Sequence, residues 1–246
     1  MALRRTPIVD AALDRAVTIP SATIHAHVDS VRRRNPEGTP AEIIGLLERE
    51  YLLVVQGTGG AVGAAAAAPA VGTGVAMALT IGDVATFFGA SAAFSLAVAS
   101  VHGIDVEDAE RRRALLLATI LGESGAKAVT DVGELTGLRG LNVARALLTR
   151  MPTGTIRRVN ARLTRQLFRK QLARQGGLAL GRMVPFGVGA VIGITGGRAL
   201  GRTVIQGARK AFGPPPDRWT DSVLVVEATE GAPRLIEQPR RHLPRR

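Results

Sequence analysis

The chain has 246 residues, of which 46% are hydrophobic, only 3% are aromatic, and 29 are glycine. So much apolar material excludes a disordered chain, and the scarcity of aromatic residues is unlike an ordinary enzyme core. The absence of cysteine excludes disulfides and thiolate metal sites, whereas the net charge of +12 points to an anionic partner.

Short N-terminal helices are predicted over residues 1–38. A helix over 9–17 ends at Ile19-Pro20, and a second helix follows and runs as far as the Asn-Pro-Glu-Gly turn at 35–38. Residues 1–20 lack the apolar stretch of a signal peptide, and the absence of cysteine fits a reducing cytoplasm.

The next helix begins with a capping box. Thr39 and Glu42 have the required spacing, and Pro40 occupies the first helical position, where its missing N–H costs nothing. This pattern predicts a helix over 40–55. It also marks the start of a helical domain over 39–213.

An apolar region follows at 52–104, where Asp83 is the only charged residue. About 20 uncharged residues can cross the hydrocarbon core of a bilayer. We therefore predict two apolar helices, over roughly 52–78 and 82–102, that form a helical hairpin. Since alanine and glycine are weakly hydrophobic, this hairpin either inserts into a membrane or forms the core of a soluble domain.

The charges in and around the hairpin bear on both interpretations. A carboxylate in lipid is costly, so Asp83 is a candidate functional carboxylate if it is buried there. Otherwise it lies at a wet turn or caps the second helix. If the hairpin spans a membrane, the arginines at 32–34 and 111–113 place both of its ends in the cytoplasm.

Small residues four positions apart allow two helix backbones to approach closely. Gly59 and Gly63 have this spacing in the hairpin, as do Gly189 and Gly193 in a third uncharged stretch over 183–197. That stretch is short for a membrane span and better suits a buried or re-entrant helix that continues to about residue 212. We expect these four glycines to pack helices together.

The whole excess of positive charge lies behind the hairpin, because residues 139–216 contain fifteen bases and no acid. Within this basic region (139–212 of the helical domain), helices are predicted over 141–149 and 155–175. Four arginines of the second helix recur at intervals of three and four and so lie on one stripe: Arg158, Arg162, Arg165 and Arg169. A basic amphipathic helix is typical of membrane surfaces, so we expect the stripe to bind anionic lipid or an acidic partner.

The remaining segments are a further helix and a tail. Residues 105–137 read as one helix with an acidic first turn, which suits the helix dipole. The Gly-Pro-Pro-Pro sequence at 213–216 ends the helical domain. In the flexible tail over 214–246, a β-prone run at 222–226 has a candidate partner at 234–236.

Other patterns do not amount to a catalytic, cofactor or metal site. The glycines after the apolar run at 52–55 lack the third glycine of a dinucleotide-binding motif, because Val62 stands in its place. His25 and His27 are two positions apart and do not face each other on a helix. Nothing in the sequence orients the serines near His102. Too few aromatic residues accompany the basic region for base stacking, which argues against nucleic acid.

Several short motifs follow one another in a characteristic order over residues 15–212. These are Ile19-Pro20 with Ile24 and His25, the glycine-rich apolar segment, the helix around Asp83 that ends in His102-Gly103-Ile104-Asp105, Pro185 with Gly189 and Gly193, and the closing run from Ala208 to Phe212. The order resembles the EcsC family of bacterial proteins. Two positions depart from the family pattern: His102 replaces the usual aromatic residue, and Gly197 stands where Asn is expected.

The resemblance implies a non-enzymatic, membrane-associated accessory to an ABC transporter or another membrane protein, or a role in membrane organisation, and it carries over no catalytic residues. We therefore expect an all-α protein, built around a Gly/Ala-rich apolar hairpin and without a cofactor. Its expected location is the cytoplasmic side of the cell membrane, either peripheral or with an inserted hairpin. The alternative is a soluble helical binding module whose Arg-rich face docks an acidic protein or nucleic acid.

Overall fold

The computed structural model describes residues 7–66, 73–135, 143–178, 188–220, 222–227 and 234–239. These residues are mostly helical, as the sequence predicts, and a three-stranded sheet completes the fold. The elements among them are α1 (Pro7–Val17), α2 (Ser21–Arg34), α3 (Pro40–Ala66), α4 (Thr73–Val101), β1 (Ile104–Val106), α5 (Ala109–Ile120), α6 (Glu123–Leu135), α7 (Val143–Thr149), α8 (Thr153–Leu178), α9 (Val188–Phe212), β2 (Ser222–Glu227) and β3 (Arg234–Pro239).

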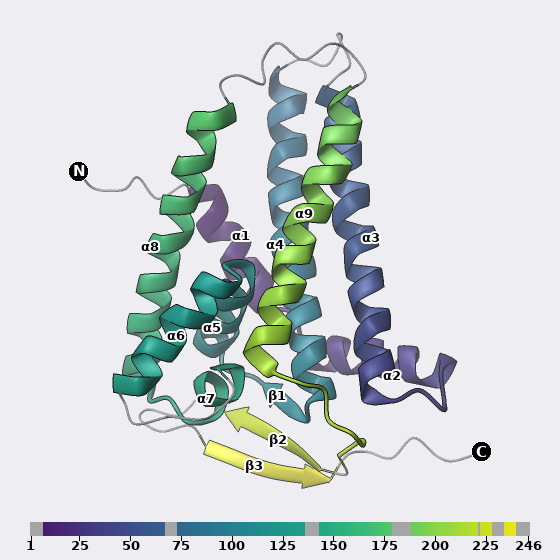
Figure 1. Cartoon of the computed structure of the whole chain (residues 1–246), viewed down its shortest axis with the longest axis vertical. Coiled ribbons are helices and arrows are strands. Elements are labelled where there is room, and N and C mark those ends of the chain that lie inside the picture. The colour runs from purple at the N-terminus through teal and green to yellow at the C-terminus, as the bar shows by residue number, and fades with distance from the viewer. Residues whose placement is uncertain are drawn as a thin grey trace.

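Three long helices, α3, α4 and α9, stand side by side, and α8 stands beside them with α5 and α6 between (Figure 1). The small sheet and α2 lie at the lower end of this bundle, and α1 packs against α4. One hydrophobic core runs through the lower half of the molecule, where the last turns of α4 are almost fully buried. Higher up, residues 82–90 of α4 are mostly half-buried.

The predicted apolar hairpin is present, but its boundaries differ from the prediction. The capping box forms, with the Thr39 backbone N–H donating to Glu42 Oε2 at 2.8 Å and the Glu42 N–H donating to Thr39 Oγ1 at 3.3 Å. The helix that starts there continues without a break through the glycine-rich segment to Ala66. The prediction of separate helices over 40–55 and 52–78 is therefore wrong, because the glycines here do not interrupt a helix that packs on two neighbours.

Asp83 lies inside α4, since this helix begins ten residues earlier at Thr73. The alternative that Asp83 occupies the turn or caps the second helix is therefore wrong. Its side chain is half-buried. Among the described residues, one helical segment, Gly82–Val101, is long and apolar enough to cross a bilayer, and more than half of it is buried inside the protein.

Glycine allows α3 and α9 to pack closely as antiparallel helices. A Cβ atom at Gly197 would lie 2.6 Å from the Val55 carbonyl oxygen, and one at Gly201 would lie 2.8 Å from Leu52 Cδ2. The EcsC pattern has Asn at the position of Gly197, and here the neighbouring backbone leaves no room for that side chain. Of the four glycines predicted to pack helices, Gly59 is half-buried in α3. The predictions for Gly63, Gly189 and Gly193 fall on positions whose surroundings are outside the described part of the structure.

The sheet joins segments far apart in the sequence. Strand β1 pairs in parallel with β2, with Ile104 opposite Leu224, and β2 pairs antiparallel with β3, with Val225 opposite Ile236. The β2–β3 pair confirms the β-prone tail. The prediction of one helix over 105–137 is wrong in two respects. Residues 104–106 form β1, and the helical part that follows is divided into α5 and α6.

The arginines at 111–113 connect elements inside the fold. Arg111 is 2% exposed and donates to the carbonyl oxygens of Leu147 (2.9 Å), Leu148 (2.9 Å) and Met151 (2.7 Å), where α7 ends. Arg112 donates to backbone carbonyls around the α1–α2 junction and of β1, and Arg113 pairs with carboxylates of α1. The side chains of the arginines at 111–113, which the sequence analysis considered as charges flanking a membrane span, thus bind acceptors inside the protein.

Candidate functional site

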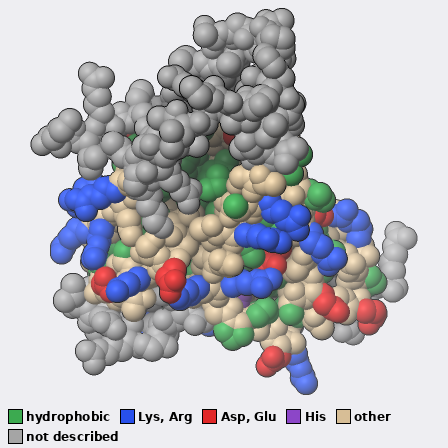
Figure 2. Space-filling view, turned by 45° about the horizontal axis from the view of Figure 1, so that its top comes forward, with side chains coloured by type: hydrophobic (Ala, Val, Ile, Leu, Met, Phe, Trp, Pro, Cys, Tyr) green, Lys and Arg blue, Asp and Glu red, His purple; other side chains and the backbone are tan. Residues whose placement is uncertain are grey.

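The predicted arginine stripe lies on the exposed side of α8. Its buried side, formed by Ile156, Val159 and Leu163, packs within the protein, mainly on α5. The exposed side carries Arg157 as well as the four predicted residues, Arg158, Arg162, Arg165 and Arg169. Figure 2 shows that Lys and Arg side chains cover more of one molecular face than Asp and Glu do.

Few carboxylates accompany the stripe. Arg162 Nη2 lies 3.3 Å from Asp131 Oδ2, and Arg165 Nε donates to the Ala161 carbonyl oxygen at 3.1 Å. Within the described part of the chain, no carboxylate lies within 4.0 Å of Arg158, Arg165 or Arg169. Their charge is therefore available to an external anion.

A groove between α6 and α8 collects most of this charge. It has a volume of about 660 Å³ and is lined by four cations and one carboxylate, namely Lys127, Arg162, Arg165, Arg169 and Asp131. Ser124 and Gln166 add polar groups. We call this set of residues the basic groove. It contains three of the four predicted arginines, whereas Arg158 lies nearer the start of α8.

Lys127 was not predicted from the sequence as part of the site. Its spacing of four residues from Asp131 does place the two on one face of α6, which is the available signal. That this face borders α8 depends on tertiary packing, which the spacing does not reveal.

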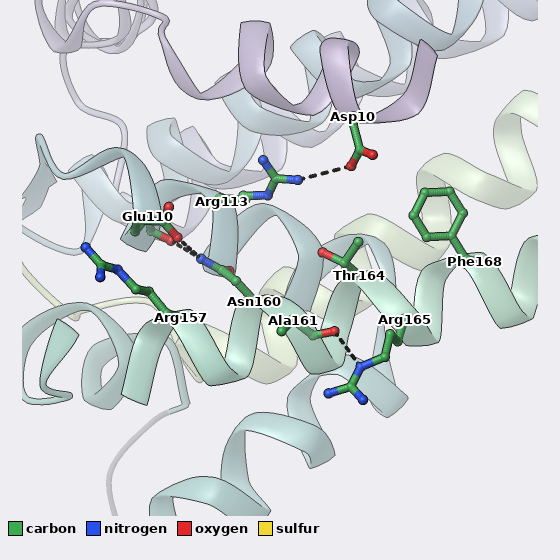
Figure 3. Close-up of a pocket in the computed structure, with 9 residues that line it drawn as sticks. All are labelled: Asp10, Glu110, Arg113, Arg157, Asn160, Ala161, Thr164, Arg165 and Phe168. Atoms are coloured by element: carbon green, nitrogen blue, oxygen red, sulfur yellow. Dashed lines mark hydrogen bonds and ion pairs between the residues drawn. The ribbon is translucent and has the colours of Figure 1, made fainter. Parts of the chain in front are cut away.

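A second hollow, of about 700 Å³, lies on the other side of α8, toward α1 and α5 (Figure 3). Here the carboxylates already have internal partners. Asn160 Nδ2 donates to Glu110 Oε2 at 2.6 Å, and Arg113 Nη2 lies 3.3 Å from Asp10 Oδ1. This hollow is consequently closer to charge balance than the basic groove.

Asp83 borders neither hollow, since α4 is not among the elements that line them. The candidate functional carboxylate and the arginine stripe thus do not form one site in the structure.

Two motifs from the EcsC resemblance meet although some 80 residues separate them. Asp105 Oδ1 accepts a hydrogen bond from Ser21 Oγ at 2.9 Å, and its Oδ2 lies 3.4 Å from His25 Nε2. Arg112 Nη2 donates to Ser21 Oγ at 2.6 Å. The network fixes α2 against β1 and α5. Among the described residues, no group of three or more His, Cys, Asp or Glu side chains is placed to hold a metal ion.

The serines near His102 form hydrogen bonds within the core. Ser91 Oγ lies 2.8 Å from the Tyr51 hydroxyl oxygen, and Ser95 Oγ lies 3.1 Å from Thr119 Oγ1. The His102 ring instead stacks on Phe212 with a centroid distance of 5.2 Å. His102 therefore packs through its ring against an aromatic neighbour.

Replacing His102 with phenylalanine is expected to reduce the loss of stability on acidification. Burial of the imidazole, and then the charge of Arg145, lower the pKa of His102 below its ordinary value of 6.5. The unfolded chain therefore takes up a proton before the folded chain does, so the free energy of unfolding falls as the pH drops below 6.5. Urea denaturation at neutral and mildly acidic pH measures this slope.

The phenylalanine variant keeps the ring stack on Phe212, so its stability should vary less with pH over this interval. His27→Gln is the control, because His27 lies on the surface. An unchanged slope in His102→Phe would show that the proton uptake occurs elsewhere.

Comparison of the chain with protein-family models, with curated proteins and with solved structures finds no match.

Proposed function

We propose that the protein is a non-enzymatic, membrane-associated protein similar to the EcsC family, which attaches to an anionic membrane surface on the cytoplasmic side. The observation that carries this proposal is the basic groove, where four cations surround a single carboxylate. The resemblance adds an accessory role beside an ABC transporter or another membrane protein.

The chemistry of the basic groove suits a phosphate headgroup. Arginine presents a planar fork of N–H donors that matches phosphate oxygens, and three arginines share the groove with Lys127. Each Lys or Arg near an anionic membrane surface contributes about 1 kcal/mol. Both walls are helices that pack on the rest of the fold, so the backbone positions that carry these cations are fixed.

Peripheral attachment is favoured over a bilayer span. The apolar side of α8 packs inside the protein, so α8 has no apolar face left to insert. More than half of Gly82–Val101 is buried as well. Exposed apolar side chains on the packed pair α3 and α9 offer a shallow second contact: Leu53 (70% exposed), Val54, Ile194 and Leu200.

The same burial supports a second candidate function. A fold that buries more than half of Gly82–Val101 is compatible with a soluble binding module. In that case the basic groove would dock an acidic protein or nucleic acid.

Vesicle binding tests the proposal. The chain is expected to co-sediment with phosphatidylcholine vesicles that contain phosphatidylglycerol, to be released by high salt, and not to sediment with phosphatidylcholine alone. Changing Arg158, Arg162, Arg165 and Arg169 together to glutamine should weaken binding by about tenfold or more, because a rigid face brings only part of the stripe to the surface at once.

The control variant removes the same charge from exposed positions on other elements, with Arg33, Arg49, Arg150 and Arg218 changed to glutamine. It should bind nearly as the unmodified chain does. Equal losses in both variants would mean that net charge alone attracts the protein. Retention on heparin without vesicle binding would favour the binding module.

A further inference from the structure

A separate pocket of about 570 Å³ lies at the base of the bundle, where the first turns of α3, the last turns of α4 and the end of α9 meet. The turn after α9 closes one side of it through Pro214 and Pro215. None of its lining residues belongs to the basic groove. The proposed membrane attachment therefore does not use it.

The walls of this pocket are mostly apolar. Ile44, Phe94, Val98, Ala208 and Phe212 line it, and all are buried parts of the core. Pockets of this size and lining commonly hold small organic molecules.

The charges at the pocket are compensated by one another. Arg209 donates to both oxygens of Glu48, through Nε at 2.7 Å and Nη2 at 2.5 Å. Lys210 Nζ contacts Glu123 at 2.5 Å. Because each cation already faces a carboxylate, the pocket has no excess charge to attract an ion.

His102 supplies a polar group in the wall. Its ring is stacked on Phe212, and no hydrogen bond to its ring nitrogens is found among the described residues. An uncharged imidazole has one N–H donor and one nitrogen acceptor. It can therefore orient a single hydrogen-bonding group of a ligand.

From these features we infer that the pocket binds a small, uncharged and largely apolar molecule that carries one hydrogen-bonding group, with His102 as its polar contact. The apolar walls hold the body of the ligand, and the Glu48–Arg209 pair closes the rim.

Gly45 provides a means to fill the pocket without disturbing the fold. It lines the pocket on α3, and a Cβ atom there would meet nothing within 4 Å. Gly45→Leu places a side chain in this space. Gly57→Leu is the matched control, because Gly57 lies on the same helix and is equally unobstructed, but is not part of the pocket. Ala41→Leu, at an exposed position of the pocket rim, is a second blocking variant.

The probe is N-phenyl-1-naphthylamine, which is uncharged, apolar and has one N–H group, and whose fluorescence rises in an apolar site. The unmodified chain is expected to bind it saturably with one-to-one stoichiometry and a micromolar Kd. Gly45→Leu should weaken binding by about tenfold or more, whereas Gly57→Leu should not. Melting curves establish that each variant is folded.

The anionic counterpart, 8-anilino-1-naphthalenesulfonate, has the same aromatic body with an added sulfonate. Binding to the pocket is the binding that is lost in Gly45→Leu. By this criterion, the affinity of the pocket for the anionic probe should be about tenfold lower than its affinity for the neutral probe. Non-saturable binding of the neutral probe, or equal binding by Gly45→Leu, would overturn the assignment of the pocket. Preference for the sulfonate would overturn the uncharged character of its ligand.

Discussion

Replacing Arg111 with methionine is expected to lower the free energy of unfolding by about 3 kcal/mol, which is more than a hundredfold in the folding equilibrium. The variant loses three hydrogen bonds to buried carbonyl oxygens at the end of α7. Each such acceptor costs about 1–3 kcal/mol when it is left unpaired. Burial also lowers the pKa of Arg111, which shows that holding this charge inside has a cost of its own. The net loss is therefore smaller than the sum of three hydrogen bonds.

The measurement is urea denaturation or thermal melting, and the expected fall in Tm is roughly 6–12 °C for a chain of this size. The stability of Arg111→Lys should lie between that of Arg111→Met and that of the unmodified chain, because an ammonium group cannot reproduce the planar fork that reaches three carbonyls. Arg150→Met is the control, since Arg150 is exposed near the same end of α7. A methionine variant as stable as this control would mean that water replaces the guanidinium.

Gly207→Ala is expected to cost about 3 kcal/mol, because α9 packs backbone against backbone on the α5–α6 junction at this point. A Cβ atom at Gly207 would lie 2.2 Å from the Thr119 carbonyl oxygen and 3.0 Å from Gly122 Cα. Neither group is the end of a flexible side chain, so a whole helix must shift to make room. The expected result is a lower urea midpoint with an unchanged helical signal.

Gly196→Ala makes the same substitution on the same helix in open space, where a Cβ atom meets nothing within 4 Å. It should raise stability by about 0.5–1 kcal/mol, since alanine is the better helix former. Opposite signs for the two variants would show that the cost at Gly207 comes from the contact. Equal effects would place α9 farther from α5 than the structure has it.

The parts of the fold that were predictable depend on local patterns. The capping box at Thr39 and the paired β-prone runs of the tail each involve residues close in sequence. The spacing of arginines on α8 likewise predicts their common face, because helical periodicity does not require a tertiary neighbour.

The parts that were not predictable depend on distant partners. Strand β1 has three residues, and neither its length nor its composition separates it from the helices on either side; its pairing with β2 decides its conformation. The sequence likewise does not show that Arg111 is buried, because its carbonyl partners at the end of α7 lie 36 to 40 residues away along the chain. The pocket at His102 and the basic groove each combine helices that are remote in sequence.

The parallel pairing of β1 with β2 has a consequence for biosynthesis. Ile104 pairs with Leu224, roughly 120 residues later, so β1 leaves the ribosome roughly 6–24 s before its partner at about 5–20 residues per second. During that interval the N–H and C=O groups along β1 are without their strand partner, which leaves an edge able to pair with another nascent chain. The helical core can assemble first, and β2 covers that edge once it has been translated.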